Sequence, residues 1–205
     1  MKKVIQYLIR NNIHRLAMLF KKGVHLSTIL TWRCNHRCEY CPITIMSNDW
    51  IKEPDADINY VLETIDKFPV NLKSVGITGG EPTLHPQFTE YTNDLLNRGH
   101  FVTVFTNLAR YERILKVKKT HRFKIYATNH ESTSAEKFIK KVDAIRKDYH
   151  IICREFKNHD PQLDFSTKRD IIELAEFDIA NKNVLLMDTH CNITTTCYNR
   201  IKDNI

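Results

Sequence analysis

The sequence lacks the long apolar runs that mark membrane and secreted proteins. No stretch of about 18 uninterrupted apolar residues occurs in the 205 residues, so no membrane-spanning helix is predicted. Polar residues between Arg10 and Arg15 interrupt the apolar positions near the start, which argues against a secretory signal peptide. Internal repeats and low-complexity segments are also missing. The composition, with 42% hydrophobic and 27% charged residues, is that of an ordinary globular domain with a packed core.

The cysteine pattern does not suit a disulfide framework. Six cysteines are present, and three of them lie close together at irregular spacing. Without a signal peptide, we expect reduced thiols in the cytoplasm, where such a cluster is a candidate metal site. The net charge of +7 favours anionic partners such as nucleic acid, nucleotides or acidic lipid. The basic residues are scattered, however, and most are interpreted as solvated helix faces.

Three segments are expected along the chain. Residues 1–24 are predicted to form an amphipathic helix, because their apolar residues recur every three or four positions. We interpret this helix as packing on a core domain over residues 25–190; peripheral membrane contact, suggested by lysines at both ends of the helix, is the less favoured alternative. Residues 191–205 are predicted to be a short C-terminal tail.

Short apolar runs alternate with helical patterns through the core domain. The runs cover His25–Trp32, Leu72–Thr78, Phe101–Thr106, Arg122–Thr128, His150–Glu155 and Asn183–Asp188. The helical patterns cover Asp57–Lys67, Pro86–Arg98, Ala109–Leu115, Ser132–Asp148 and Ser166–Phe177. This alternation predicts an α/β fold of parallel strands, and six units suit a partial (β/α)6 barrel better than a closed one of eight. The ligand site is then expected beyond the carboxyl ends of the strands.

A cysteine motif follows the first predicted strand. Cys34, Cys38 and Cys41 have the spacing C-x-x-x-C-x-x-C, and Tyr40 directly precedes the last of them. Iron–sulfur clusters usually take four cysteine ligands, so three would leave one iron of a four-iron cluster open. A zinc site is the alternative, but zinc prefers four ligands in two separated pairs, and His36 lies inside the same loop.

A second motif follows the second predicted strand. It reads Gly79, Gly80, Glu81 and Pro82. Paired glycines allow the backbone to approach a ligand where a Cβ atom would clash, and Glu81 adds a carboxylate beside that backbone. Taken alone, the same residues are also typical of an ordinary turn.

The two motifs, in this order and after these strands, resemble the signature of the radical S-adenosylmethionine (SAM) superfamily. The resemblance implies that Cys34, Cys38 and Cys41 hold a [4Fe–4S] cluster whose open iron binds the amino and carboxylate groups of SAM. It further implies that one electron from the cluster cleaves SAM, and that the resulting 5′-deoxyadenosyl radical takes a hydrogen atom from a substrate.

The resemblance also suggests residues that contact SAM. They are Tyr40 at the adenine, Gly79, Gly80 and Glu81 at the amino group, Thr128 and Asn129 at the ribose, and Arg154 at the carboxylate. Arg154 beside Glu155 is also compatible with an ordinary ion pair. Thr106 and Asn107 resemble the T-N-G motif of the family, with Leu108 in place of glycine, and they are expected to face SAM or substrate.

Two further groups of residues are interpreted as structural. Histidines near strand ends, His85, His130 and His190, are expected to be hydrogen-bonded or at the surface. The remaining cysteines are Cys153, Cys191 and Cys197. They are one too few for a second cluster of four ligands, and we interpret them as free or buried thiols.

The function implied is that of an enzyme acting on a small molecule, a nucleotide or a peptide. An activating enzyme that installs a glycyl radical on a partner protein is the alternative. A non-catalytic iron–sulfur or zinc module that contacts nucleic acid is less favoured, because it leaves the second motif unexplained. The radical reaction requires a low-potential electron donor of the flavodoxin or ferredoxin kind. The fold alone does not identify the substrate, because substrate contacts come from variable loops.

Overall fold

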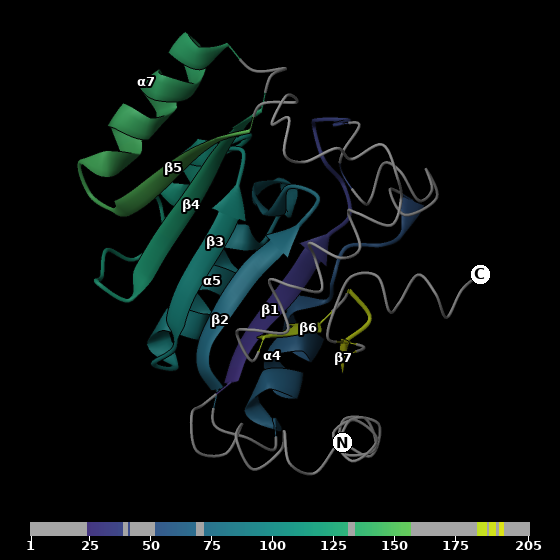
Figure 1. Cartoon of the computed structure of the whole chain (residues 1–205). Coiled ribbons are helices and arrows are strands. Elements are labelled where there is room, and N and C mark those ends of the chain that lie inside the picture. Colours follow the sequence, from purple (N-terminus) through teal and green to yellow (C-terminus); the bar gives the residue numbers. More distant parts are fainter. Residues whose placement is uncertain are drawn as a thin grey trace.

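The computed structural model describes residues 24–38, 41, 52–68, 72–130, 134–156, 184–187, 189–191 and 193–194. Within them, one sheet of seven strands has the order β5-β4-β3-β2-β1-β6-β7 (Figure 1). The strands are β1 (Val24–Thr31), β2 (Leu72–Gly79), β3 (Phe101–Thr106), β4 (Phe123–His130), β5 (His150–Phe156), β6 (Val184–Met187) and β7 (Ile193–Thr194). The helices are α4 (Ile58–Asp66), the 3-10 helix η2 (Pro82–Leu84), α5 (Phe88–Asn97), α6 (Tyr111–Ile114) and α7 (Ala135–Arg146).

The strands from β1 to β6 are parallel, and β7 runs antiparallel to β6. Each of the six predicted runs forms one of the parallel strands, so the expected α/β class is confirmed. The sixth strand does not follow the fifth in space: β6 pairs with β1, while β5 forms the opposite edge of the sheet. The carboxyl ends of the parallel strands therefore meet at one edge of the sheet, with β1 next to the centre.

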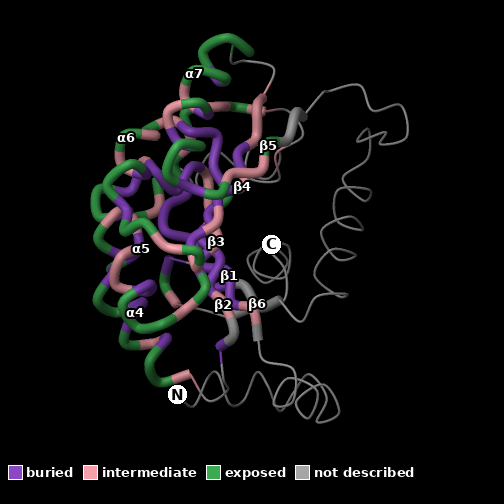
Figure 2. Tube along the Cα trace, turned by 90° about the vertical axis from the view of Figure 1, so that its left-hand side faces the viewer, coloured by how far each residue is buried: buried purple, intermediate pink, exposed green. Residues whose placement is uncertain are grey.

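The described helices cover one face of this sheet (Figure 2). Burial alternates along the strands as the pleat requires, so that Val102, Val104 and Ile125 face the helices and are fully buried. From α5, Tyr91 and Leu95 pack into the same core. Each such side chain contributes on the order of 1.5–3 kcal/mol through burial, which stabilises the packing of the helices on the sheet.

Local capping sets the ends of two helices. The Asp57 carboxylate accepts hydrogen bonds from the backbone N–H groups of Asn59 and Tyr60, which begins α4. Helix α5 ends at Asn97, and Gly99 follows with a positive φ of 93°. A left-handed residue just beyond a helix end is tolerated best by glycine, so the chain can turn at once into β3.

Some expectations fall outside the described residues. The helix predicted over residues 1–24 lies almost wholly outside them, and the pattern at Ser166–Phe177 lies entirely outside. In the predicted tail, Ile193–Thr194 form the short strand β7. Among the described helices, none combines the length and the apolar character needed to cross a membrane.

Candidate active site

A pocket of about 230 Å³ lies at the carboxyl ends of the first four strands. Its lining comes from the loop after β1 and from the ends of β2, β3 and β4. The lining residues are Cys34, His36, Cys38, Cys41, Thr78, Gly79, Gly80, Glu81, Phe105, Thr106, Asn107, Thr128 and His130. Residues from both sequence motifs therefore share one cavity, although they are separated along the chain.

The three cysteines of the first motif are partly buried free thiols in this pocket. The backbone N–H of Cys41 donates to the carbonyl of Cys38 at 3.0 Å, which closes a turn between the last two. Burial raises the pKa of the Cys34 thiol to about 11, and the nearby Glu81 adds to the effect. A thiol with such a pKa is protonated at neutral pH until a metal ion displaces the proton. Within the described residues, no three His, Cys, Asp or Glu side chains converge as ligands of one metal ion.

The glycine pair fits closely against the end of β1. A Cβ atom on Gly79, whose φ is 138°, would lie 2.3 Å from the carbonyl oxygen of Thr31. One on Gly80 would lie 2.4 Å from the carbonyl oxygen of Arg33. The nearest backbone to both glycines is that of the end of β1 and the segment after it. Both also line the pocket, and their contact with a ligand stays a prediction. Because the glycines lack side chains, the backbone N–H of Gly80 can donate to the carbonyl oxygen of Thr31 at 2.9 Å, and that of Glu81 to the carbonyl oxygen of Arg33 at 2.8 Å. These two hydrogen bonds fix the start of the cysteine loop.

Glu81 is buried, and the protein itself satisfies most of its carboxylate. Oε1 accepts from the backbone N–H of Thr83 at 3.0 Å, from the Thr83 hydroxyl at 2.5 Å and from the Thr106 hydroxyl at 2.6 Å. Oε2 accepts from the backbone N–H of Asn107 at 2.6 Å. Burial raises the pKa of Glu81, and these four donors oppose that shift by favouring the charged form. The carboxylate thus joins the segments that follow β2 and β3.

Asn107 lines the pocket and has a buried side-chain acceptor that lacks a donor among the described residues. The residue is only 6% exposed, and its Nδ2 donates to Asn35 Oδ1 at 3.0 Å. Its Oδ1 has no hydrogen-bond partner among the described residues. A buried acceptor left without a donor costs about 1–3 kcal/mol, so a ligand with an ammonium or hydroxyl group would be stabilised here. SAM carries both groups, and the acceptor of Asn107 therefore fits it.

The next residue explains the departure from the T-N-G pattern. Leu108 takes the glycine position with a φ of 64°, in the left-handed region, and its side chain is buried. Adopting that conformation costs a non-glycine residue on the order of 1–2 kcal/mol. The backbone therefore keeps the turn that glycine would favour, and Leu108 packs into the core instead.

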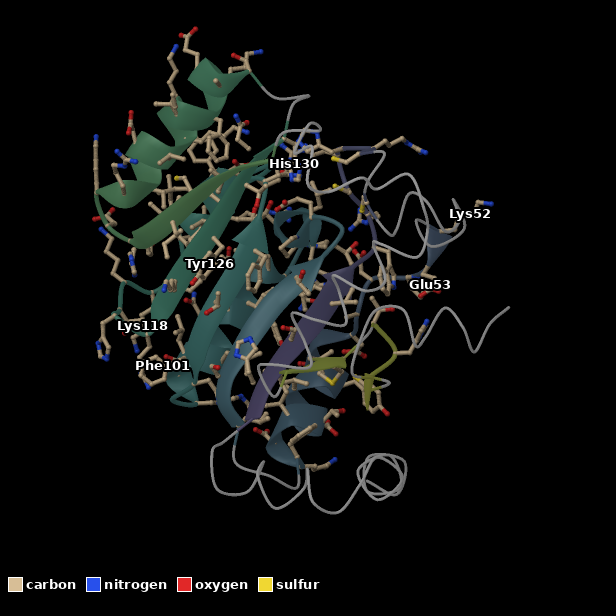
Figure 3. The ribbon with its side chains drawn as sticks, viewed as in Figure 1. Lys52, Glu53, Phe101, Lys118, Tyr126 and His130 are labelled. Carbon is tan, nitrogen blue, oxygen red and sulfur yellow. The ribbon has the colours of Figure 1, made fainter. Side chains whose placement is uncertain are left out.

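Two histidines lie beside the cysteines. His130, at the end of β4 (Figure 3), has Nδ1 3.6 Å from Cys38 Sγ. Its ring centroid lies 5.4 Å from that of His36. Neither histidine was predicted to lie in the site, and His36 was considered only as a zinc ligand. The available signal was that His130 follows Thr128 by two residues, so the two side chains share a face of β4.

An aromatic pair borders the pocket on the face that the described helices leave open. Phe105, which lines the pocket, stacks on Tyr126 with ring centroids 5.4 Å apart and an interplanar angle of 15°. The Lys124 ammonium lies 5.1 Å from the Tyr126 ring centroid. In Figure 3, Tyr126 lies further down the sheet than His130. These residues were not predicted from the sequence, because aromatic residues in strands usually pack in the core.

The other predicted SAM contacts are placed only in part. Thr128 lines the pocket, and Asn129 is partly buried with an Oδ1 that has no partner among the described residues. The backbone of Arg154 pairs with that of Thr128 across β4 and β5, but its side chain lies outside what the structure describes. Tyr40 also lies outside the described residues. The structure therefore gathers the two motifs and Thr128 in one pocket.

Comparison with known proteins points to one family. The model of the radical SAM superfamily matches residues 28–159. A tungsten-containing aldehyde ferredoxin oxidoreductase cofactor-modifying protein of Pyrococcus furiosus is 34% identical over 84 residues, covering 38% of this chain and 22% of that protein. A proposed glycyl-radical enzyme activating enzyme of Methanocaldococcus jannaschii is 34% identical over 82 residues, covering 39% of this chain and 30% of that protein. GTP 3′,8-cyclase of Microcystis aeruginosa is 31% identical over 74 residues, covering 35% of this chain and 22% of that protein.

Solved structures show a looser likeness. Streptococcus suis SuiB bound to S-adenosylmethionine superposes with a TM-score of 0.48 at 17% identity, covering 97% of this chain and 52% of that one. The matches to curated relatives span less than a third of the length of those proteins.

Proposed function

Because this chain belongs to the radical SAM superfamily, whose members use a [4Fe–4S] cluster and SAM, we propose that it is an enzyme that reductively cleaves SAM. The observation that carries the proposal is the shared pocket: Cys34, Cys38 and Cys41 line it together with the glycine pair and the Asn107 amide. In this proposal the three cysteines hold the cluster as thiolates. When bound, the cluster supplies one electron that splits SAM into methionine and a 5′-deoxyadenosyl radical, which takes hydrogen from the substrate.

We assign the SAM contacts by the chemistry of the pocket. The unpartnered Asn107 Oδ1 accepts from an ammonium or hydroxyl group of SAM. Thr128 offers a hydroxyl on the same wall, as the ribose contact requires. Glu81 acts through its bond to the Asn107 backbone, which holds the amide in place. Tyr40 and Arg154 remain proposed contacts with the adenine and the carboxylate.

We propose that the substrate is a small molecule, a nucleotide or a peptide that approaches along the open sheet face. The stacked pair Phe105 and Tyr126 offers an aromatic wall beside the pocket, and Lys124 adds a positive charge next to that wall. Aromatic faces favour planar groups, and a cation favours an anionic one. The similarity to GTP 3′,8-cyclase and to a cofactor-modifying protein supports a small or nucleotide substrate.

A second candidate is an activating enzyme for a glycyl-radical protein, which the similarity to the Methanocaldococcus jannaschii protein favours. The two candidates differ in what triggers SAM cleavage. An activating enzyme forms 5′-deoxyadenosine at a high rate only with its partner protein, whereas a small-molecule enzyme responds to its substrate. Both need a low-potential electron donor of the flavodoxin or ferredoxin kind, and both are proposed to work in the reducing cytoplasm.

The proposal is tested with protein whose cluster is reconstituted without oxygen. Dithionite and SAM are added, and 5′-deoxyadenosine and methionine are quantified. We expect both products from the wild type and none from Cys38→Ala. The matched control is Cys153→Ala, which removes an exposed cysteine on β5 and should retain activity. A wild type that binds neither cluster iron nor SAM would refute the proposal and favour a zinc or nucleic-acid module.

A further inference from the structure

Side-chain N–H groups from two neighbouring strands reach the thiols of the cysteine loop. His130, at the end of β4, has Nδ1 3.6 Å from Cys38 Sγ. Asn107, directly after β3, has Nδ2 3.8 Å from Cys34 Sγ. Sulfur accepts hydrogen bonds at longer distances than oxygen because the atom is larger. Two of the three cysteine sulfurs of the motif therefore each have a side-chain donor within reach, one from the end of β4 and one from the residue that follows β3.

We propose that His130 and Asn107 donate hydrogen bonds to the cluster-ligating thiolates and thereby raise the reduction potential of the cluster; this inference rests on the proposed function. Adding an electron increases the negative charge on the cluster and on its cysteine sulfurs. A fixed N–H dipole pointing at a sulfur stabilises the reduced form more than the oxidised form. Hydrogen bonds to sulfur are among the factors that set iron–sulfur potentials.

Each donor is held in place by contacts that do not involve a cluster. The backbone N–H of Asn107 bonds Glu81 Oε2 at 2.6 Å, and Nδ2 also donates to Asn35 at 3.0 Å. These two contacts set the direction of the amide. His130 extends from a strand and its ring lies against that of His36, with centroids 5.4 Å apart. The donor form of His130 is the tautomer with hydrogen on Nδ1.

The two donors have a role that differs from ligation. Three cysteines supply the thiolates, and a histidine nitrogen 3.6 Å from a sulfur is at the distance of a hydrogen-bond partner of that sulfur. His130 and Asn107 thus act through the ligands and not on the substrate. Their effect belongs in the potential of the cluster, which can be measured without any substrate.

The test is a redox titration of the reconstituted protein, followed by the electron paramagnetic resonance signal of the reduced cluster. His130→Phe keeps a ring and removes the donor. His130→Asn restores a donor, because its Nδ2 is the same number of bonds from Cα as histidine Nδ1. At a fixed potential, we expect the ratio of reduced to oxidised cluster to fall about 3- to 10-fold in His130→Phe, where tenfold corresponds to ~59 mV for one electron. His130→Asn should lie close to the wild type.

Asn107→Ala provides a second measurement, because the main-chain bond to Glu81 survives the substitution. It should also shift the potential to more negative values. The matched control is His121→Phe, at an exposed position outside the pocket, which should leave the potential unchanged. Iron and sulfide content separate the two levels of failure. A wild type without a cluster would refute the proposed function and this inference together. Loaded variants at both sites with the potential of the wild type would overturn this inference alone.

Discussion

The carboxylate of Glu81 accepts a hydrogen bond of 2.6 Å from the backbone N–H of Asn107, which ties the segment after β2 to the segment after β3. The Thr106 hydroxyl donates to the same carboxylate at 2.6 Å. As a buried acceptor with several donors, Glu81 therefore holds two polar loops together at the edge of the pocket. In the proposed function, SAM binding therefore depends on Glu81 through the position of Asn107.

Glu81→Gln should destabilise the protein. The amide nitrogen of glutamine is a donor, and it would face hydroxyl and N–H groups that are also donors. We expect a free energy of unfolding lower by about 1–3 kcal/mol, the cost of leaving a buried polar group unsatisfied. Urea denaturation of the cluster-free protein measures it. The control is Glu90→Gln on the exposed side of α5, which should stay close to the wild type. Equal midpoints for the two variants would contradict the structural role of Glu81.

Gly80→Ala should disturb the cysteine loop. The added Cβ would lie 2.4 Å from the Arg33 carbonyl oxygen and 2.5 Å from that of Trp32, and neither backbone atom can move without shifting the chain that leads to Cys34. We expect a loss of about 1–3 kcal/mol in unfolding free energy, typical of overpacking, together with reduced iron content after reconstitution.

Gly99→Ala is the control for that substitution. Its φ of 93° also disfavours alanine, but the nearest atom to the added Cβ is the end of the Arg122 side chain, at 3.5 Å. Stability should fall by about 1–2 kcal/mol from backbone strain alone. Iron content should stay at the wild-type level, because Gly99 precedes β3 at the opposite edge of the sheet from the pocket. An equal loss of iron in both variants would show that general destabilisation, and not the close approach at Gly80, controls cluster loading.

The strands were predictable from the sequence, whereas the contacts that build the pocket were not. The run at Phe101–Thr106 matches β3 because alternation of buried and exposed residues is encoded locally. The pairing of β6 with β1 was not predicted, since periodicity carries no information about which strands become neighbours. For the same reason the contact of His130 with Cys38, 92 residues apart, was missed. The hydrogen bonds that Glu81 accepts from Thr106 and Asn107 were not predicted either, because these residues become neighbours only in the folded sheet.

Thiol reactivity should distinguish the cysteines of the pocket from those outside it. Burial raises the pKa of Cys34 to about 11, so at neutral pH its nucleophilic thiolate form is scarce. Cys153 is exposed on β5. Brief alkylation of the cluster-free protein with iodoacetamide, read by peptide mass spectrometry, should modify Cys153 well before Cys34.

Cluster reconstitution should change only one of the two rates. It should protect Cys34 completely, since its sulfur would be bonded to iron, and leave the rate at Cys153 unchanged. Continued modification of Cys34 in fully loaded protein would contradict its assignment as a ligand.

Acid should destabilise the protein through His85. This side chain is 2% exposed, its Nε2–H donates to the Ala56 carbonyl at 3.1 Å, and its Nδ1 accepts from the backbone N–H of Gln87 at 3.2 Å. Both ring nitrogens are thus satisfied in the neutral form, and protonation would turn the Nδ1 acceptor into a donor facing another donor. Burial lowers the pKa of His85 below its ordinary value of about 6.5.

The direction of the pH dependence follows from proton binding in the two states. Below pH about 6.5 the unfolded chain takes up a proton at His85 while the folded protein does not, so the unfolding free energy falls as the pH drops toward the lowered pKa. Above that pH both states are neutral at this residue, and its contribution is constant.

Urea denaturation between pH 7.5 and about 5.5 should show this fall in the wild type. In His85→Gln the fall should be smaller, with the remainder coming from other histidines whose pKa burial lowers, His25 and His100 among them. The control is His121→Gln at an exposed position, which should keep the full wild-type slope. A His85→Gln slope equal to that of the wild type would mean that His85 binds its proton equally well in the folded and unfolded chain, contrary to its burial between Ala56 and Gln87.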